Sequence, residues 1–243
     1  MKWDVRRSPC HYTKPQMDTQ ALWLTLRLAL STTALLLALA LPLAWWITTS
    51  ATTGPASAAR AIVQAAVALP LVLPPTVLGF YLLVALGPLT GPGRLIIRLL
   101  GHPLAFSFEG LLLGSILYSL PFAVQPLVAG FRAIDPALLE AAATLGAPPL
   151  RAFYTITLPL AKPSLLTAAI LTFTHTVGEF GIVLMLGGNI PGATRTLSIA
   201  LYDQVQDFNY AAANRTAGLL LAFSLLTLVV VYWRGAARRP LLG

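Results

Sequence analysis

Long apolar runs, separated by shorter polar segments, organise the chain. The runs cover residues 21–47, 61–86, 110–131, 164–186 and 216–233, and each contains 18 residues or more. A helix of about 20 residues crosses the roughly 30 Å of hydrocarbon in a bilayer. Because a backbone inside lipid must satisfy its own hydrogen bonds, each run is expected to form a helix. The pattern therefore predicts an all-α integral membrane protein with five transmembrane helices.

Three prolines interrupt the second run, at Pro70, Pro74 and Pro75. Each proline removes a backbone N–H, so the helix must kink or break where neighbours or water can satisfy the freed carbonyl groups. The interruption is interpreted either as a packing feature or as a flexible wall of a transport pathway. Broken helices are typical of transporters, whereas prolines are common in membrane helices generally, so both interpretations stay open.

The segments that connect the runs differ in character. Residues 87–108 are rich in glycine and proline, and they are predicted to be a loop that carries Arg94 and Arg98. Residues 195–210 are predicted to form a short amphipathic helix at the surface. The connection at residues 132–163 has a more definite pattern.

Both ends of the chain are polar. Residues 1–16 are basic and without periodicity, and because the next apolar run is too long for a signal peptide, they are not interpreted as one. We interpret them as a disordered extension or the product of a start codon assigned too early. The membrane domain is expected at residues 17–235, followed by a short tail at 236–243.

Residues 132–163 predict two short helices joined by a rigid elbow. Asp135 suits a helix N-cap, and Gly146 suits the position just after a helix end. A second helix is expected at residues 150–157, ended by Pro159. This coupling segment is too polar to span a bilayer, yet it carries apolar side chains that favour contact with a partner: Leu138, Leu139, Leu145, Phe153 and Ile156.

The coupling segment resembles the cytoplasmic EAA loop of ABC importer permeases. The resemblance depends on the spacing E-A-A-x3-G-x9-I-x-L-P, which is found at Glu140, Ala141, Ala142, Gly146, Ile156, Leu158 and Pro159. It implies that the first short helix docks into a groove on an ATPase subunit and that the residues from Glu140 to Gly146 seat it. It also implies that Phe153, Leu158 and Pro159 set the angle to the fourth span. The alternative is an ordinary amphipathic helix–turn–helix between two spans.

Two further segments resemble the molybdate branch of these permeases. One is G-E-F-G at residues 178–181, followed by N-I-P-G-x-T-x-T at 189–196, and the other is L-P-L-V-L-P-P at 69–75. Close variants occur in sulfate permeases, which usually carry an additional N-terminal span that is not found among these five runs. The resemblance therefore favours a permease for molybdate, with sulfate or tungstate as the alternative.

Ionisable residues inside the fourth run are His175 and Glu179, four residues apart and hence on one face of a helix. A charge inside a membrane is costly and normally faces the bundle interior. The two residues are interpreted as a structural pair that joins helices or as pathway or gate residues. A carboxylate on the route would repel an anion, which favours the structural interpretation. The candidate pathway or gate residues are Pro70, Pro74, Pro75, Glu179, Asn189 and Thr196, with Arg195 as a candidate at the outer mouth or facing lipid.

Composition supports the membrane assignment. The 243 residues are 57% hydrophobic and 10% charged, whereas soluble domains carry about 25% charged residues. The net charge of +8 is scattered among apolar runs, so it fits anionic lipid better than nucleic acid. The sequence contains no phosphate-binding G-x-x-x-x-G-K-[ST] loop, no metal-ligand cluster and no nucleophile paired with a base. The chain is therefore expected to be a transport subunit without enzymatic activity or a cofactor of its own, and ATP and Mg²⁺ would be used by a separate ATPase.

Orientation follows from an odd number of spans, which places the termini on opposite sides of a bacterial cytoplasmic membrane. If the coupling segment is cytoplasmic, the C-terminus is cytoplasmic and the N-terminus is outside. The positive-inside rule supports this assignment when residues 1–16 are left out. The inner basic residues would be Arg60, Arg132, Arg151, Lys162, Arg234, Arg238 and Arg239.

Five helices are few for enclosing a hydrated route, so a twofold homodimer is expected. The family resemblance implies the same homodimer, two ATP-binding cassette subunits, and an extracytoplasmic molybdate-binding protein. Transport would then proceed by alternating access. Two more distant hypotheses are a small membrane enzyme and an ATP-independent channel.

Overall fold

The computed structural model describes residues 18–49 and 55–236, and within these ranges the chain is helical with no strand. The expectations for residues 1–16 and for the tail beyond Ala236 lie outside the described residues. The helices are α1 (Thr19–Thr48), α2 (Pro55–Val72), α3 (Pro75–Ala85), α4 (Gly91–Leu100), α5 (Phe108–Arg132), α6 (Pro136–Thr144), α7 (Pro149–Ala152), the π-helical turn η1 (Phe153–Thr157), α8 (Leu158–Leu160), α9 (Lys162–Gly178), α10 (Gly181–Gly187), α11 (Leu197–Gln206) and α12 (Tyr210–Ala236).

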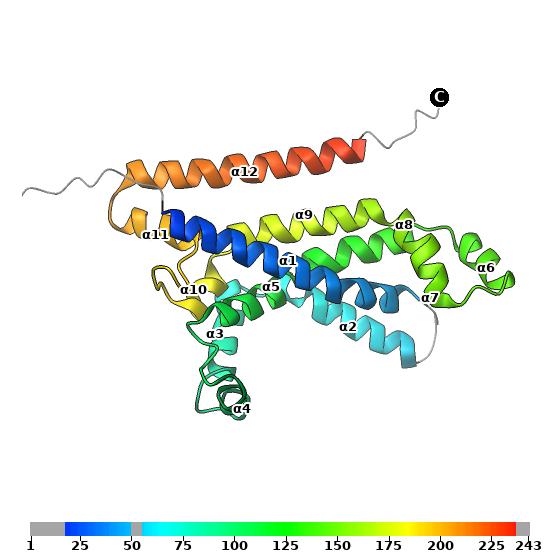
Figure 1. Ribbon diagram of the computed structural model, residues 1–243, viewed down its shortest axis with the longest axis horizontal. Coiled ribbons are helices and arrows are strands. Elements are labelled where there is room, and N and C mark those ends of the chain that lie inside the picture. The colour runs from blue at the N-terminus through cyan, green and yellow to red at the C-terminus, as the bar shows by residue number, and fades with distance from the viewer. Residues whose placement is uncertain (1–17, 50–54, 237–243) are drawn as a thin grey trace, which may run out of the picture.

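The helices α1, α2, α5, α9 and α12 run along the long direction of the molecule (Figure 1). Among the described residues, α1, α5 and α12 are each long and apolar enough to cross a membrane alone. Two bent pairs bring the number of candidate spans to as many as five: α2 with α3, at 111°, and the helical segment 149–160 with α9, at 70°. This architecture confirms the predicted all-α membrane fold.

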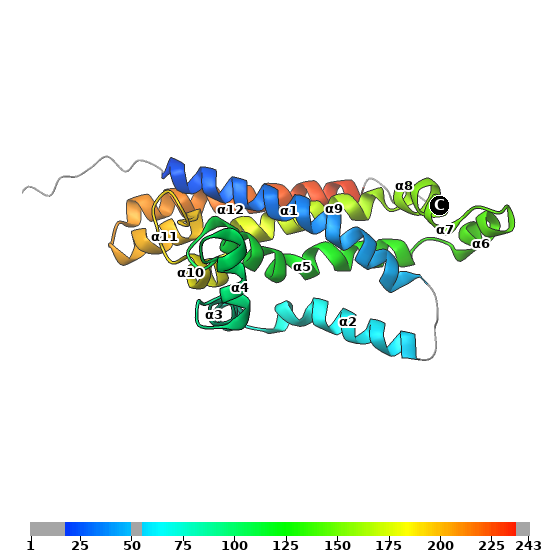
Figure 2. The ribbon, with the colours of Figure 1, turned by 60° about the horizontal axis from the view of Figure 1, so that its bottom comes forward.

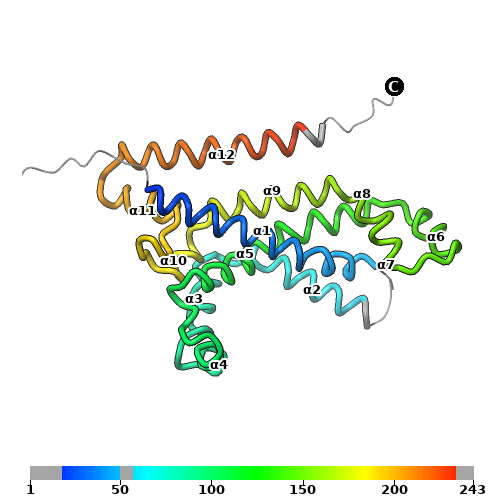
Figure 3. The backbone as a smooth tube through the Cα atoms, viewed as in Figure 1, coloured from blue at the N-terminus to red at the C-terminus, as the bar shows by residue number. Residues whose placement is uncertain are grey.

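The bundle is built around α1, α5 and α9, which pack against one another. Figure 2 shows α5 between α2 and α9. One apolar cluster joins α1, α2, α5 and α9 near the coupling segment, and a second joins α1, α3, α5, α10 and α11 at the opposite end. In Figure 3, α12 lies at the edge of the bundle, and its exposed leucines, together with Val229, form an apolar surface suited to lipid.

The second run breaks between α2 and α3, next to Pro74 and Pro75, whereas Pro70 lies within α2. Pro74 has an extended backbone and precedes Pro75, which begins α3. A proline at the first helical position costs little, because its missing N–H would have no partner there. The bend of 111° between α2 and α3 is therefore a change of direction rather than a slight kink.

The predicted loop at residues 87–108 is wrong in its central part, where α4 forms. Thr90 caps this helix by accepting a hydrogen bond from the Gly93 N–H (3.1 Å), and Gly101 ends it in a left-handed conformation. The glycines and prolines that suggested a loop therefore mark the ends of a short amphipathic helix.

The fourth run is also divided, because α9 ends at Gly178 and α10 begins at Gly181. Glu179 between them has an extended backbone, with φ −66° and ψ 132°. The predicted surface helix at 195–210 is shorter, as α11, and its first turn is buried at residues 197–200. A hydropathy pattern detects neither the break between α9 and α10 nor the burial of the first turn of α11. It measures the apolar content of a segment and not the direction of its backbone or its neighbours.

Candidate coupling surface and transport pathway

The first helix of the coupling segment, α6, begins at a side-chain cap. The carboxylate of Asp135 accepts a hydrogen bond from the Ala137 N–H at 2.9 Å, and Pro136 occupies the first helical position. These local interactions satisfy one free backbone donor and place the start of the helix as the sequence predicts.

The end of α6 is a Schellman motif. The Ala147 N–H donates to the Ala142 carbonyl at 3.0 Å, and the Gly146 N–H donates to the Ala143 carbonyl at 2.9 Å. Gly146 has a φ of +77°, which side chains with a Cβ rarely adopt. A Cβ at this position would meet no atom within 4 Å, so conformation rather than space favours glycine.

The outer surface of α6 is available to a partner. Figure 1 shows α6 at one tip of the molecule, at the opposite end from α10 and α11. Glu140 and Ala141 are exposed, Ala142 is buried, and Leu145 is 87% exposed. An exposed leucine beside a carboxylate on a projecting helix is suited to a groove with both apolar and polar groups.

Phe153 attaches the coupling segment to the bundle. Its ring lies 4.9 Å from the ring of Trp45 on α1 and 6.0 Å from that of Phe131 on α5, measured between centroids. Phe153 is buried, whereas the neighbouring Tyr154 is 60% exposed. The ring therefore contacts two spans other than the one that follows it in sequence.

The remaining candidate residues of the coupling segment differ in how far they are buried. Leu158 is partly buried against the same apolar cluster as Phe153, Ile156 is also partly buried, and Pro159 is exposed. The second short helix was predicted to end before Pro159. In the structure the helical segment instead continues to Leu160. Pro159 lies in the first turn of α8, after η1, where a missing N–H is tolerated.

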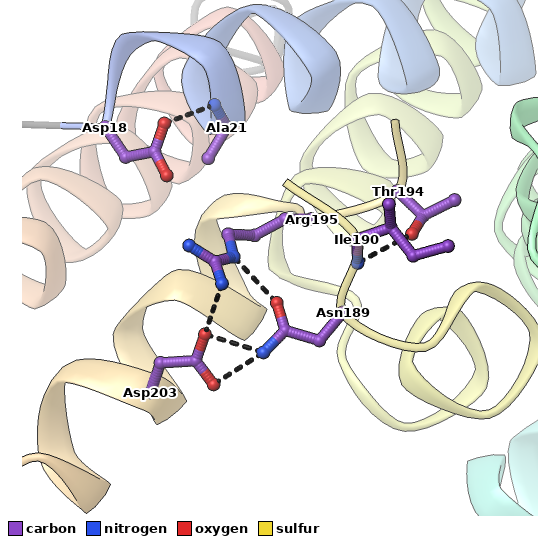
Figure 4. A network of polar contacts seen from close by, with 7 residues as sticks. All are labelled: Asp18, Ala21, Asn189, Ile190, Thr194, Arg195 and Asp203. Atoms are coloured by element: carbon purple, nitrogen blue, oxygen red, sulfur yellow. Dashed lines mark hydrogen bonds and ion pairs between the residues drawn. The ribbon is translucent and has the colours of Figure 1, made fainter. Parts of the chain in front are cut away.

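At the opposite end, Asn189, Arg195 and Asp203 form one polar network (Figure 4). The Asn189 amide donates to both carboxylate oxygens of Asp203, at 2.8 and 2.7 Å, and its carbonyl accepts from Arg195 Nε at 2.7 Å. Arg195 Nη2 also lies 3.4 Å from Asp203. The network joins the break after α10 to α11. The charge of Arg195 is thus compensated by a carboxylate.

A shallow pocket of about 240 Å³ lies beside this network. Its described charged residues are Arg195 and three aspartates, Asp18, Asp203 and Asp207. Because carboxylates outnumber the guanidinium group, the pocket of a single chain is less suited to capturing an anion than Arg195 alone suggested.

Glu179 lies in the break between α9 and α10 and contacts two other elements. Its Oε2 accepts a hydrogen bond from the Ser115 hydroxyl of α5 at 2.8 Å, and its backbone carbonyl accepts one from Ser198 of α11. The Thr196 hydroxyl lies 2.9 Å from that of Ser198. Glu179 and Thr196 are buried within the chain, and these contacts connect the break in the fourth run to α5 and α11.

His175 and Glu179 do not form the direct pair that their spacing suggested. His175 Nδ1 lies 3.0 Å from the Ser119 hydroxyl, and the imidazole stacks on Phe122. Each of the two residues contacts a different serine of α5, so both join α5 to the fourth span by separate contacts.

Replacing Ser115 with alanine should remove the described hydrogen-bond partner of Glu179. A buried polar group that loses its partner costs about 1–3 kcal/mol, so we expect a lower thermal unfolding midpoint for the purified chain in detergent. The matched variant Glu179→Gln keeps an acceptor for Ser115 and should retain uptake within about twofold of the unmodified chain. Loss of uptake in Glu179→Gln at unchanged stability would instead indicate a pathway role for the carboxylate.

The prolines of the second run occupy different environments. Pro70 is buried, Pro74 is exposed, and Pro75 lies against Gly181 at the start of α10. A Cβ on Gly181 would come within 2.9 Å of the Pro75 ring. The structure thus brings Pro75 close to the Glu179 region.

A groove of about 480 Å³ between α2 and α5 was not predicted from the sequence. Its polar residues are Gln64, Gln125 and Arg132, and Arg132 Nη2 donates to Gln64 Oε1 at 3.1 Å. Alanines and valines form the rest of its lining. In the sequence, the feature that could have indicated this groove is the pair of amide side chains within apolar runs.

No cluster of three potential metal ligands occurs in the described parts of the chain.

Comparison with known proteins identifies the family. Residues 40–238 match the family described as binding-protein-dependent transport system inner membrane component. The chain belongs to this family. It is 50% identical over 216 residues to the molybdenum transport system permease protein ModB of Azotobacter vinelandii, covering 88% of this chain and 93% of that protein.

The chain is also similar to a sulfate permease and to a solved transporter structure, both at lower sequence identity. It is 32% identical over 172 residues to a probable sulfate transport system permease protein cysT of Chlorella vulgaris, covering 71% of this chain and 64% of that protein. Its fold is similar to a chain of the MetNI methionine ABC transporter in inward-facing conformations. The TM-score is 0.69 at 19% identity, with 91% of this chain and 95% of that chain covered. The ABC importer permease fold predicted from the EAA spacing is thereby confirmed.

Proposed function

We propose that the chain is the membrane-spanning permease subunit of an ATP-driven importer that carries molybdate across the bacterial cytoplasmic membrane. The observation that carries this proposal is the identity of 50%, over nearly the whole length of both chains, to a protein named as a molybdenum transport system permease. The lower identity to a sulfate permease makes sulfate the second candidate. Tungstate, which forms a similar tetrahedral dianion, is the third.

The coupling surface would transmit force from a separate ATPase. Its support is the exposed α6, held by a capped N-terminus and a Schellman C-terminus, together with the Phe153 contacts to α1 and α5. Movement of α6 would then reach three spans at once, because α9 continues from the same segment. Two ATPase subunits would act on two copies of this chain.

The route for the anion would form where two copies of the chain meet. The groove between α2 and α5 supplies amides and one arginine, which suits an oxyanion that must pass without being trapped. An extracytoplasmic binding protein, as the family description implies, would supply selectivity from the end that carries α10 and α11. In the proposed arrangement the coupling segment and the C-terminus would lie inside and the N-terminus outside.

Reconstitution tests the proposal. The chain would be placed in proteoliposomes with its ATPase and binding protein, and uptake of radiolabelled molybdate measured with ATP, without ATP and without the ATPase. We expect uptake only when all components are present, and inhibition by unlabelled molybdate at lower concentration than by sulfate.

Other outcomes would support the rival functions. Stronger inhibition by sulfate or tungstate would change the substrate but not the importer mechanism. Steady flux without the ATPase would indicate a channel and contradict the coupling role of α6.

A further inference from the structure

The surface of α4 carries two kinds of exposed side chain on neighbouring faces. Arg94 and Arg98 are one helical turn apart, and so are Leu95 and Leu99 beside them. Leu95 is 56% exposed and Leu99 is 75% exposed. In the described parts of the chain neither arginine forms an ion pair. A short helix with cationic and apolar faces is suited to the boundary between lipid and water.

The direction of α4 is held by a tight turn before it. The Thr90 hydroxyl donates to the Ala85 carbonyl at 2.6 Å and accepts from the Gly93 N–H. A Cβ on Gly93 would lie 1.9 Å from the Gly87 carbonyl oxygen, so the chain can approach this closely only at glycine. Ile96 packs against the second apolar cluster. The exposed face of α4 therefore has a defined direction relative to the bundle.

Charged residues place α4 at the level of a membrane boundary. The Arg27 guanidinium lies 4.2 Å from the centre of the Phe108 ring, and Glu109 interacts electrostatically with Arg27 and with His102, which follows α4. The charge-free parts of α1 and α5 begin directly after Arg27 and Glu109. In Figure 1, α4 is seen nearly end-on, across the direction of the spans.

We propose that α4 is an interfacial helix that binds anionic lipid headgroups. Leu95 and Leu99 insert into the acyl-chain boundary, while Arg94 and Arg98 extend to lipid phosphates. The inference requires the chain to span a bilayer, but it does not depend on which anion is transported. It assigns to this segment a partner that neither the coupling surface nor the pathway uses.

Insertion of α4 can be measured with a fluorescent label. In a chain whose single cysteine is removed by Cys10→Ser, Leu99→Cys would carry an environment-sensitive dye, and the protein would be placed in nanodiscs. Lipids with a nitroxide near the carbonyl end of the acyl chain should quench this dye. Leu95→Cys gives a second position on the same face. Leu145→Cys on α6 is the matched control and should be quenched little.

The charge requirement needs a second measurement. Quenching of the Leu99→Cys label by nitroxide-labelled phosphatidylglycerol is compared with quenching by the phosphatidylcholine analogue. Each arginine is expected to raise the preference for the anionic lipid by about fivefold at low salt. The double variant Arg94→Gln, Arg98→Gln should lower the ratio to about one. Arg151→Gln, at an exposed arginine of the coupling segment, should leave the ratio unchanged.

Three results would overturn the proposal. The first is quenching at Leu99→Cys no greater than at Leu145→Cys, and the second is equal quenching by the two lipids in the unmodified background. The third is a disulfide between two copies at residue 99 in place of lipid quenching, which would assign the face to a second copy of the chain. None of these readouts depends on transport, so failure here is distinguishable from failure of the proposed importer function.

Discussion

The variant Gly146→Val is expected to weaken ATPase binding about five- to thirtyfold and to lower ATP-driven molybdate uptake with it. Gly146 has a φ of +77°, and a left-handed backbone costs an ordinary residue about 1–2 kcal/mol. Valine is β-branched and so adopts this region even less readily. The strain should open the Schellman turn and change the direction in which α6 leaves the bundle. Binding would be measured by titrating the ATPase onto nanodiscs that contain the chain.

Gly101→Val is the matched control for this variant. Gly101 also follows a helix end, has a φ of +80° and leaves open space around a Cβ. It directly follows α4, which lies well away from α6 (Figure 1). We expect ATPase affinity to be unchanged in this control. Equal affinity for Gly146→Val and the unmodified chain would contradict the docking role of α6.

The second large effect is expected from Phe153→Ala. Truncating a buried phenylalanine costs about 3–5 kcal/mol, because the ring contacts with Trp45 and Phe131 are lost and a cavity remains. The outer surface of α6 is not altered, so the ATPase should still bind. Its hydrolysis should no longer drive uptake, because the coupling segment has lost its contact with α1 and α5. The measurements are the unfolding midpoint, ATPase affinity and the ratio of molybdate transported to ATP hydrolysed.

Two further variants sharpen this test. Tyr154→Ala removes the next aromatic residue, whose side chain is largely exposed, and should change stability by no more than about 0.5 kcal/mol. Phe153→Leu retains part of the buried volume and should recover part of the transport ratio. A normal transport ratio in Phe153→Ala, despite lower stability, would show that force reaches the spans through the chain connection to α9 alone.

The features that could be predicted from sequence depend on neighbours within a few residues. The start and end of α6 follow from Asp135 and Gly146, because a cap and a left-handed turn are local structures. The presence of membrane-length helices follows from apolar length, because the bilayer imposes the same minimum on every crossing, and α1, α5 and α12 each reach that length alone. The same local signals caused the error at α4, where helix-ending glycines and prolines were interpreted as a loop.

The candidate site depended on contacts between separate elements, some of them distant in sequence. Glu179 and Ser115 are 64 residues apart, and their hydrogen bond forms only because α5 and the broken fourth run pack together. The Arg195 side chain is oriented by Asn189 and Asp203, which a periodic pattern does not connect. The groove with Gln64, Gln125 and Arg132 exists because α2 lies beside α5.

The amino-acid order alone was sufficient for the membrane class, the helical content, the two ends of α6 and the family resemblance, since each rests on length, composition or close spacing. Packing in three dimensions settled which polar groups meet, how sharply the second run turns at its prolines, where the fourth run breaks, and that Phe153 contacts two other spans. The physical reason is that a hydrogen bond or ring contact between distant segments depends on the relative placement of whole helices. Hydrophobic periodicity describes each helix separately and carries no information about that placement.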